Sequence, residues 1–170
     1  MAHQRGGDFA NMRIRQYLED EYWPARDFRT FLYMSHVLQG DAIKTAIEAH
    51  RCDKPYCWGS LFWQHNDCWP VASWASRDWY GRWKAQHYFA RPAFDDILVS
   101  PLAEGNTLNV RLVSDRRKTV RGKLRITVMD MDGALLSENT RSLTVAPNAS
   151  RNVYSADISG PVSYTHLTLP

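Results

Sequence analysis

Hydrophobic residues in the first third of the chain recur at helical spacing, in two stretches separated by a proline. The stronger pattern covers residues 27–50, where Asp27 is a natural N-cap and the apolar positions fall on one face. Those positions are Phe28, Phe31, Leu32, Leu38, Ile43 and Ile47. A shorter stretch begins at Asn11, ends at residue 22 and is stopped by Pro24. We therefore expect two helices, the longer one weakened at Gly40 by about 1 kcal/mol relative to alanine.

A short apolar run over residues 57–64 has a different character. Near-continuous hydrophobic residues that end at the polar His65 are typical of a buried parallel strand. A tryptophan-rich loop follows, and then a third expected helix over residues 79–90, capped by Asp78 and ended before Pro92. Helix, strand, loop and helix make one portion of an α/β fold. Because one strand cannot form a sheet, we expect the rest of this core to lie outside the sequence.

After Pro92 the hydrophobic pattern changes to a period of two, which predicts strands. The residues at 108, 110 and 112 are apolar and alternate with polar neighbours, as do those at 124, 126 and 128. An Asp132-Gly133 pair between two such runs indicates a hairpin turn. Two further candidate strands cover residues 134–145 and 152–158. Antiparallel strands at this spacing predict a β-sandwich of immunoglobulin-like type, incomplete because only about five strands fit.

The distribution of aromatic residues also divides the chain into two units. Nineteen of the 21 aromatic side chains lie in residues 1–94, and six of the seven tryptophans fall between Trp58 and Trp83. We expect an α/β unit over residues 1–93 and a β-sandwich over residues 94–161. Residues 162–170 continue neither pattern, and we treat them as a tail of uncertain origin.

Length and charge exclude several classes of protein. The chain has 170 residues, 44% of them hydrophobic, which predicts a packed core rather than disorder. A formal net charge of only +3 gives no reason to expect a nucleic-acid partner. No run approaches the ~18 apolar residues of a membrane span, and no secretory signal is visible at the polar N-terminus. Since Met1 need not be the true start, no compartment is assigned.

The three cysteines could serve as disulfide partners or as metal ligands. Cys52, Cys57 and Cys68 are an odd number at irregular spacing, which is no disulfide framework. Together with His50 and His65 they include enough soft ligands for zinc, but the paired C-x2-C spacing is missing. Buried inert thiols are the better interpretation. We expect no metal and no cofactor.

The segment from Trp63 to Trp69 is the richest in candidate chemistry. It places Asn66 and Asp67 between two tryptophans, directly after the expected strand. In α/β barrels, the loops at the carboxyl ends of strands form the active site. A tryptophan ring can face the apolar side of a pyranose while amide and carboxylate groups bond its hydroxyls. Core packing is the competing interpretation, because tryptophan is commonly a buried anchor.

Residues 59–91 carry a resemblance to a known family. Their sequence is GSLFWQHNDCWPVASWASRDWYGRWKAQHYFAR, and it is similar to a segment of the β-mannosidases in glycoside hydrolase family 2. Residues 22–51 resemble the helix that precedes this segment in the family. The departures are modest: His65 and Gln86 replace leucines of the family pattern, and Trp79 replaces a tyrosine.

The resemblance implies that residues 57–64 form the last strand of a (β/α)8 TIM barrel and residues 79–90 its closing helix. It further implies a retaining glycosidase that removes terminal β-linked mannose with two carboxyl groups roughly 5–5.5 Å apart. The family motifs that hold these two glutamates do not occur in the sequence, so no catalytic residue is carried over.

Four residues are carried over as candidates for the sugar site. Trp63 is the expected aromatic wall, and Asn66, Asp67 and Trp69 are weaker candidates. We interpret the chain as the C-terminal part of the barrel followed by an incomplete immunoglobulin-like β-sandwich. Its expected partners are a β-mannoside substrate and the remainder of the same polypeptide, which activity needs. The aglycone preference and the oligomeric state are left open.

Two alternatives remain. A non-catalytic carbohydrate-binding module could stack sugars on Trp63, Trp69 and Trp74, but the long helix argues against it because such modules are mostly β. A sibling family 2 enzyme, a β-galactosidase or a β-glucuronidase, is disfavoured by the W-Q-x-N-D-C-W-P segment, which is mannosidase-like.

Overall fold

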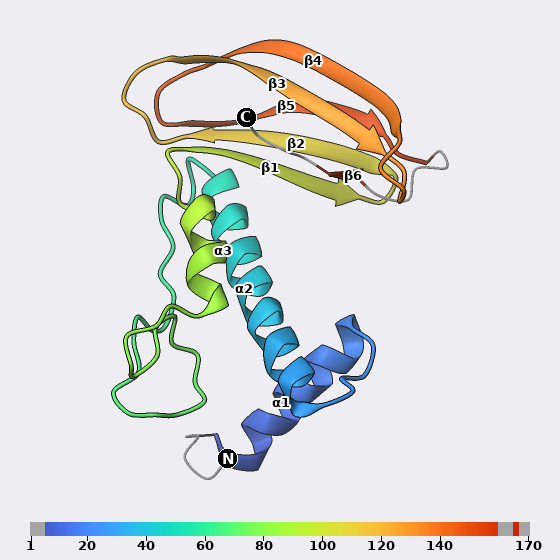
Figure 1. Ribbon diagram of the computed structural model, residues 1–170. Helices are drawn as coiled ribbons and strands as arrows, with labels where there is room; N and C mark the ends of the chain where they lie inside the picture. The colour runs from blue at the N-terminus through green and yellow to red at the C-terminus, as the bar shows by residue number, and fades with distance from the viewer. Residues whose placement is uncertain (1–5, 160–164, 167–170) are drawn as a thin grey trace. The chain divides into compact units, whose positions relative to one another are not determined.

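The structure, a computed structural model, describes residues 6–159 and 165–166 (Figure 1). These residues fall into two compact units. The helical unit consists of residues 6–47 and 59–94, and the sandwich unit consists of residues 48–58, 95–159 and 165–166. Part of the expected tail, residues 162–164 and 167–170, lies outside the described residues.

Both expected N-terminal helices are confirmed. Helix α1 covers Gly7–Glu21 and begins one turn before the expected Asn11, with Gly6 in the cap position. Helix α2 covers Phe28–Cys52. Its N-cap is Asp27, as predicted, because Oδ1 of Asp27 accepts a hydrogen bond of 2.7 Å from the backbone N–H of Thr30.

The third helix differs from the prediction at both ends. Helix α3 covers Ala85–Ala93, so it starts six residues late and continues past Pro92. Asp78 caps a turn instead of a helix. The Oδ1 of Asp78 accepts a hydrogen bond from the backbone N–H of Arg82 at 2.9 Å, and Gly81 within this turn has a φ of +84°. A left-handed residue at this position ends any helix started at Asp78, because α-helical residues need negative φ.

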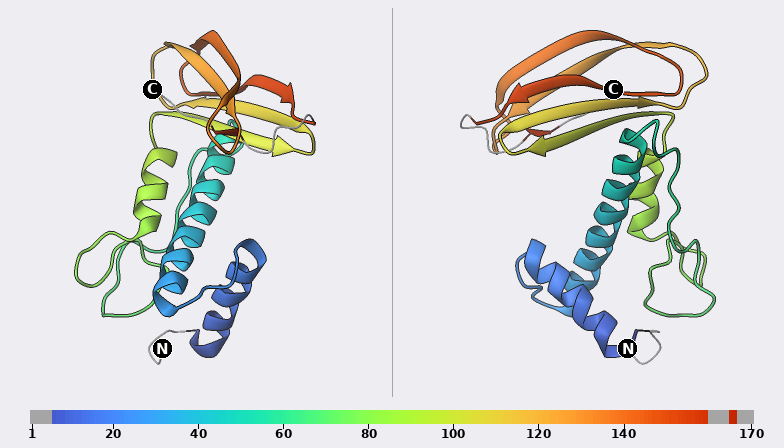
Figure 2. Two further views of the ribbon diagram at one scale, coloured as in Figure 1. Left: turned by 45° about the vertical axis from the view of Figure 1, so that its right-hand side comes forward. Right: turned by 180° about the vertical axis from the view of Figure 1, so that it is seen from behind.

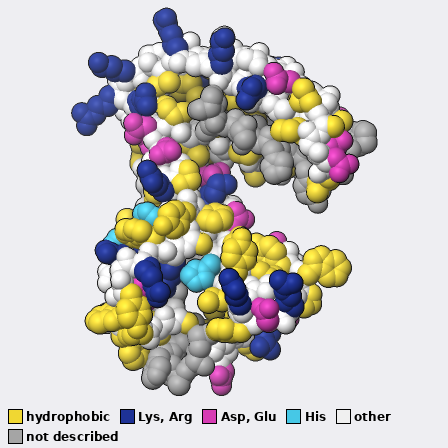
Figure 3. All heavy atoms as spheres, viewed as in Figure 1, with side chains coloured by type: hydrophobic (Ala, Val, Ile, Leu, Met, Phe, Trp, Pro, Cys, Tyr) yellow, Lys and Arg dark blue, Asp and Glu magenta, His cyan; other side chains and the backbone are white. Residues whose placement is uncertain are grey.

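Helices α2 and α3 pack against each other in the helical unit (Figure 2). The buried residues of this small core are Ile47, Ala90 and Ala93, with Ile43 and Phe62 against them. Hydrophobic side chains are nevertheless prominent on the surface of the unit (Figure 3). Trp23, Tyr33 and Leu61 are among the exposed large ones. Exposed apolar surface on this scale is typical of surfaces that pack against another protein segment.

The expected strand over residues 57–64 is wrong. The structure has no strand there, and Trp58, Leu61 and Trp63 are exposed. A parallel strand needs a neighbouring strand to satisfy its backbone groups, and no described segment pairs with these residues as a strand. The apolar run is therefore the beginning of an irregular loop in this chain.

The sandwich unit contains, among the described residues, six antiparallel strands in two sheets. They are β1 Ile97–Glu104, β2 Thr107–Ser114, β3 Val120–Met129, β4 Leu135–Val145, β5 Ala149–Asp157 and β6 Thr165–His166. One sheet has the order β1-β2-β5 and the other β4-β3-β6 (Figure 2). The predicted strands are confirmed. Strand β1 escaped prediction because Pro101 interrupts its pattern, and proline is tolerated there because β1 is an edge strand.

The two sheets share a core that follows from the period-two pattern. Leu108 and Val110 of β2 pack with Leu124 and Ile126 of β3. The predicted hairpin is also confirmed: Asp130 Oδ1 accepts from the backbone N–H of Ala134 at 2.8 Å, and Gly133 has a φ of +85°. Local turn chemistry therefore sets the register between β3 and β4.

The end of α2 belongs to the sandwich unit through a cluster of charges in which the side chains of Arg51 and Lys54 are buried and that of Asp115 is exposed. Arg51 Nη2 donates to Asp115 Oδ2 at 2.8 Å and to the Asp95 carbonyl at 2.7 Å, and Lys54 Nζ also contacts Asp115. Burial alone would raise the pKa of Asp115, but the hydrogen bonds and charges of Lys54 and Arg51 outweigh it and hold this pKa below its ordinary value.

Candidate functional site

The four predicted site residues lie on one irregular loop, residues 59–84, which contains neither helix nor strand. Trp63 is 73% exposed and Trp69 is 48% exposed, so neither ring is a core residue in this chain. Asn66 is also exposed. Asp67 differs from these three residues because it is buried.

Backbone hydrogen bonds give this loop a defined shape. Ser76 N–H donates to the Gln64 carbonyl at 3.0 Å, and Arg77 N–H donates to the His65 carbonyl at 3.0 Å. Asp67 N–H donates to the Arg77 carbonyl at 2.9 Å. The residues that follow Trp63 are therefore paired with a second segment about ten residues later through isolated bridges, without forming a continuous strand.

Asp67 is the centre of a buried polar cluster within the loop. Its Oδ2 accepts from Lys84 Nζ at 2.9 Å, and its Oδ1 accepts from the Ser73 hydroxyl. The side chains of Asp67 and Lys84 are only 1% and 11% exposed. Both carboxylate oxygens are thus occupied by groups of the loop, which differs from the expectation that they face sugar hydroxyls.

Helix α2 contributes two polar residues next to this loop. Gln39 Nε2 donates to the Trp74 carbonyl at 3.0 Å. Burial lowers the pKa of His36, and the positive charge of Lys84 lowers it further. The lowered pKa favours the neutral form of His36 near the positive charge of Lys84.

A second cluster surrounds Trp83. The Trp83 ring stacks on His87 with centroids 3.9 Å apart, and the His65 ring meets it edge-on at 5.6 Å. Arg77 lies over the same ring at 5.2 Å, and its Nε donates to the Gly81 carbonyl at 3.0 Å. His65, which replaces a leucine of the family pattern, is therefore an aromatic neighbour of Trp83.

Sequence reasoning missed Lys84 and Ser73 as members of the site. One signal was available: a carboxylate within an apolar loop needs a cation when it is buried, and Lys84 is the only lysine in residues 59–91. The pairing of Asp67 with Lys84 depends on how residues 67–84 fold back on themselves. The local pattern of hydrophobic and polar residues does not predict that path.

The other carboxylate of the loop, Asp78, is no candidate for a general acid. Burial would raise its pKa, but hydrogen bonds and the charge of Arg82 hold that pKa below its ordinary value. A general acid needs a proton near neutral pH. The loop therefore offers aromatic and amide groups for binding, and no acid for bond cleavage.

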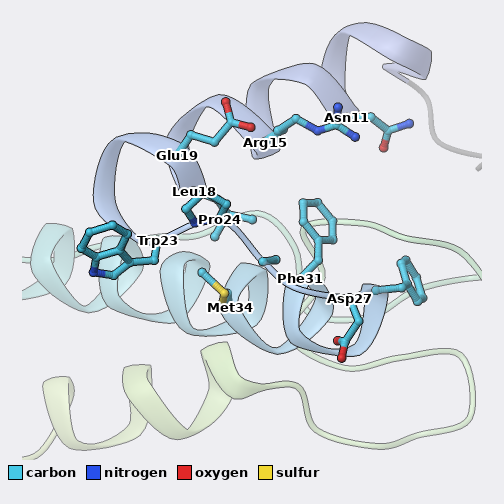
Figure 4. A pocket seen from close by; sticks show the side chains of 11 residues that line it. Asn11, Arg15, Leu18, Glu19, Trp23, Pro24, Asp27, Phe31 and Met34 are labelled. Carbon is cyan, nitrogen blue, oxygen red and sulfur yellow. The ribbon is translucent and has the colours of Figure 1, made fainter.

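A cavity of about 540 Å³ lies elsewhere in the helical unit, between α1 and the start of α2 (Figure 4). Asn11, Arg15 and Glu19 of α1 border it on one side, and Phe31 and Met34 of α2 border it on the other. None of the four predicted site residues lines it. Its Asp27 carboxylate is already used as the cap of α2.

Neither a metal centre nor a membrane span is found within the described ranges. Residues 6–159 and 165–166 bring no three histidine, cysteine or acidic side chains together in a group able to hold a metal ion. All three cysteines are free thiols, and Cys68 is exposed rather than buried as expected, because it lies on the irregular loop. In that same part of the chain, no helix has the length and apolar character needed to cross a membrane.

Comparison with known proteins defines the class of the chain. The domain family described as "Mannosidase Ig/CBM-like domain" matches residues 106–166. β-Mannosidase A of Aspergillus fumigatus is 32% identical over 143 residues, which cover 78% of this chain and 15% of that protein. β-Mannosidase of Mus musculus is 37% identical over 102 residues, 56% of this chain and 12% of that protein. The sandwich unit therefore includes a mannosidase immunoglobulin-like domain, and most of the chain is similar to a segment of β-mannosidases.

Solved structures agree with this class. The β-D-mannosidase of Dictyoglomus thermophilum superposes with a TM-score of 0.86 at 30% identity, covering 95% of this chain and 20% of that chain. An exo-chitosanase of Amycolatopsis orientalis superposes with a TM-score of 0.69 at 19% identity, covering 91% of this chain and 21% of that chain, which shows the fold alone. The chain is therefore similar to a segment of β-mannosidases, and it spans about a seventh of the length of the Aspergillus relative.

Proposed function

We propose that the chain is the C-terminal part of a TIM barrel and the start of the following sandwich in a retaining β-mannosidase that hydrolyses terminal β-D-mannose. Its loop over residues 59–84 forms one wall of the mannose site. The observation that carries the proposal is the pair of exposed rings, Trp63 and Trp69, on a loop whose sequence resembles that of β-mannosidases.

The exposed groups of this loop suit a pyranose. The flat ring of Trp63 can cover the apolar C–H face of the sugar, and Trp69 offers a second apolar surface. Asn66 donates through Nδ2 to the Asp67 carbonyl at 3.1 Å. Its Oδ1 has no donor among residues 6–159, so it is available to accept from a sugar hydroxyl.

The remainder of the polypeptide supplies the rest of the barrel and both catalytic carboxyl groups. Exposed apolar side chains of the helical unit, such as Leu61 and Tyr33, support this division because they need a covering surface. The isolated chain should not hydrolyse a β-mannoside, since retaining hydrolysis needs a nucleophile together with an acid/base.

The test is the substitution Trp63→Ala in the complete polypeptide, assayed with an aryl β-mannoside. Stacking that strengthens as the sugar ring flattens contributes to the transition state, so kcat should fall and KM should rise. We expect kcat/KM to fall by about 30- to 1000-fold, which corresponds to roughly 2–4 kcal/mol. Met131→Ala, at an exposed hydrophobic residue in the turn between β3 and β4 of the sandwich unit, is the control and should leave kcat/KM unchanged.

Two results would overturn the proposal. One is a Trp63→Ala variant that keeps normal kcat/KM per folded molecule and has a much lower melting temperature, which would make Trp63 a packing residue. The other is a complete polypeptide that cleaves aryl β-galactosides or β-glucuronides in preference to β-mannosides.

A further inference from the structure

We propose that Asp67 is a positioning residue: it does not bind the sugar, but through its buried ion pair with Lys84 it holds the loop that presents Trp63, Asn66 and Trp69. This inference rests on the proposed function for its catalytic consequence. It replaces the direct sugar contact expected for Asp67 from the sequence.

The ion pair closes a long irregular segment. Asp67 and Lys84 are 17 residues apart, and the chain between them has neither helix nor strand. Lys84 is the residue directly before α3, and its N–H donates to the Ser76 carbonyl at 2.8 Å. The pair therefore fastens the middle of the loop to the start of a helix.

The same cluster also closes the turn that contains Trp69. The Ser73 hydroxyl donates to Asp67 Oδ1, and Lys84 Nζ approaches the Ser73 carbonyl at 3.4 Å. Residues 67 and 73 are thus held together at their side chains, with Trp69 on the turn between them. Loss of the carboxylate would remove the acceptor of the Ser73 hydroxyl and the counter-ion that holds Lys84 beside the Ser73 carbonyl.

Burial determines how the pair responds to substitution. With the two side chains only 1% and 11% exposed, solvent cannot compensate a charge whose partner has been removed. Replacing both partners by neutral side chains of similar size leaves no unpaired charge, and such replacements are often tolerated. We therefore expect a single substitution to destabilise the loop and the double substitution to restore much of its stability.

The loop position matters for catalysis because Trp63 is connected to the same network. Ser76 joins the two parts: its N–H bonds the Gln64 carbonyl next to Trp63, and its carbonyl accepts from Lys84. Displacement of a substrate-positioning group by about 1 Å can cost on the order of 100-fold in rate. Loosening the Asp67–Lys84 pair should therefore lower activity although neither side chain contacts the sugar.

The experiment compares Asp67→Asn, Lys84→Met and the double variant in the complete polypeptide. We expect each single variant to lower kcat/KM for an aryl β-mannoside by about 10- to 100-fold per folded molecule. The double variant should recover at least half of that loss on a logarithmic scale. Arg82→Met, which removes an exposed cation from the same loop, is the matched control and should stay within about twofold of the wild type.

A second measurement follows the loop without substrate. Trypsin cleavage after Arg77, detected by mass spectrometry, should accelerate in both single variants and return toward the wild-type rate in the double variant. Arg77 is half-buried and its guanidinium is bonded within the loop, so cleavage there requires opening.

The outcomes separate the two proposals. If the wild-type polypeptide does not cleave β-mannosides, the proposed function fails, and the trypsin measurement still tests the ion pair. If Asp67→Asn is impaired while Lys84→Met is normal, Asp67 contacts the sugar and the positioning role is overturned. If the single variants lower the melting temperature but leave kcat/KM and cleavage unchanged, the pair only stabilises the fold, and the inference is also overturned.

Discussion

Replacing Gly40 by alanine sets two opposite effects against each other at one position of α2. In the interior of a helix, alanine is favoured over glycine by about 1 kcal/mol. The added methyl group, however, would point at the ring of Phe89 on α3. Helix propensity and packing therefore predict changes of opposite sign.

The magnitude follows from the distances. A Cβ built at Gly40 lies 2.7 Å from Cδ2 and 2.8 Å from Cγ of Phe89, and 3.2 Å from Cε2. Carbon atoms pack at about 3.5–4.0 Å, so the ring must retreat by roughly 0.8 Å. Overpacking of this kind costs about 1–3 kcal/mol. After the gain in helix propensity is subtracted, we expect a net loss of about 1 kcal/mol.

The assay is hydrogen exchange of the peptide that covers α3, measured by mass spectrometry on the complete polypeptide. Exchange through local opening reports the free energy that holds this helix in place. A loss of about 1 kcal/mol makes exchange about fivefold faster, since 1.4 kcal/mol corresponds to a factor of ten. Adding Phe89→Leu to Gly40→Ala should reverse part of this change by making room for the methyl group.

Gly122→Ala provides the control, because a Cβ at Gly122 meets no atom within 4 Å. It should leave exchange in α3 unchanged. Slower exchange in Gly40→Ala than in the wild type would refute the reasoning, because it would show that helix propensity outweighs the contact with Phe89.

Three further predictions concern stability and its dependence on pH. Gln86 is 1% exposed, and neither of its amide atoms has a partner in the described part of the chain. Gln86→Leu should therefore increase the free energy of unfolding by about 1–2 kcal/mol and raise the melting temperature. A lower melting temperature would contradict this. Asp115→Asn removes the negative charge that both Arg51 and Lys54 contact, so hydrogen exchange in β2 should become faster by a factor that corresponds to about 2 kcal/mol. The folded pKa of His36 is below its unfolded value, so stability should decrease as the pH falls below about 6.5. His36→Gln should remove this part of the pH dependence of the melting temperature, and an unchanged profile would argue against it.

The helices α1 and α2 and most strands of the sandwich could be predicted because local features define them. Asp27 caps a helix through its own backbone neighbour three residues away. The turn between β3 and β4 follows from Asp130 and Gly133, which act within five residues of each other. Alternation of apolar residues such as Leu124 and Ile126 predicts which face of a strand is buried.

The features that could not be predicted depend on partners far away in the sequence. The apolar run 57–64 is compatible with a strand, but a strand exists only where another strand pairs with it, and none of the described segments does so. Gly40 looks like a weakness of α2 until α3 places Phe89 against it.

The same physical distinction applies to the candidate site. The residue types of the tryptophan loop indicate sugar chemistry, because rings and amides bind sugars whatever the fold. Whether a carboxylate faces the sugar or the protein is a question of burial, and burial depends on how the chain folds back on itself. Asp67 has the chemistry of a sugar ligand in the sequence, and the tertiary structure encloses it with Lys84, 17 residues away, because a buried charge is stable only beside its counter-ion.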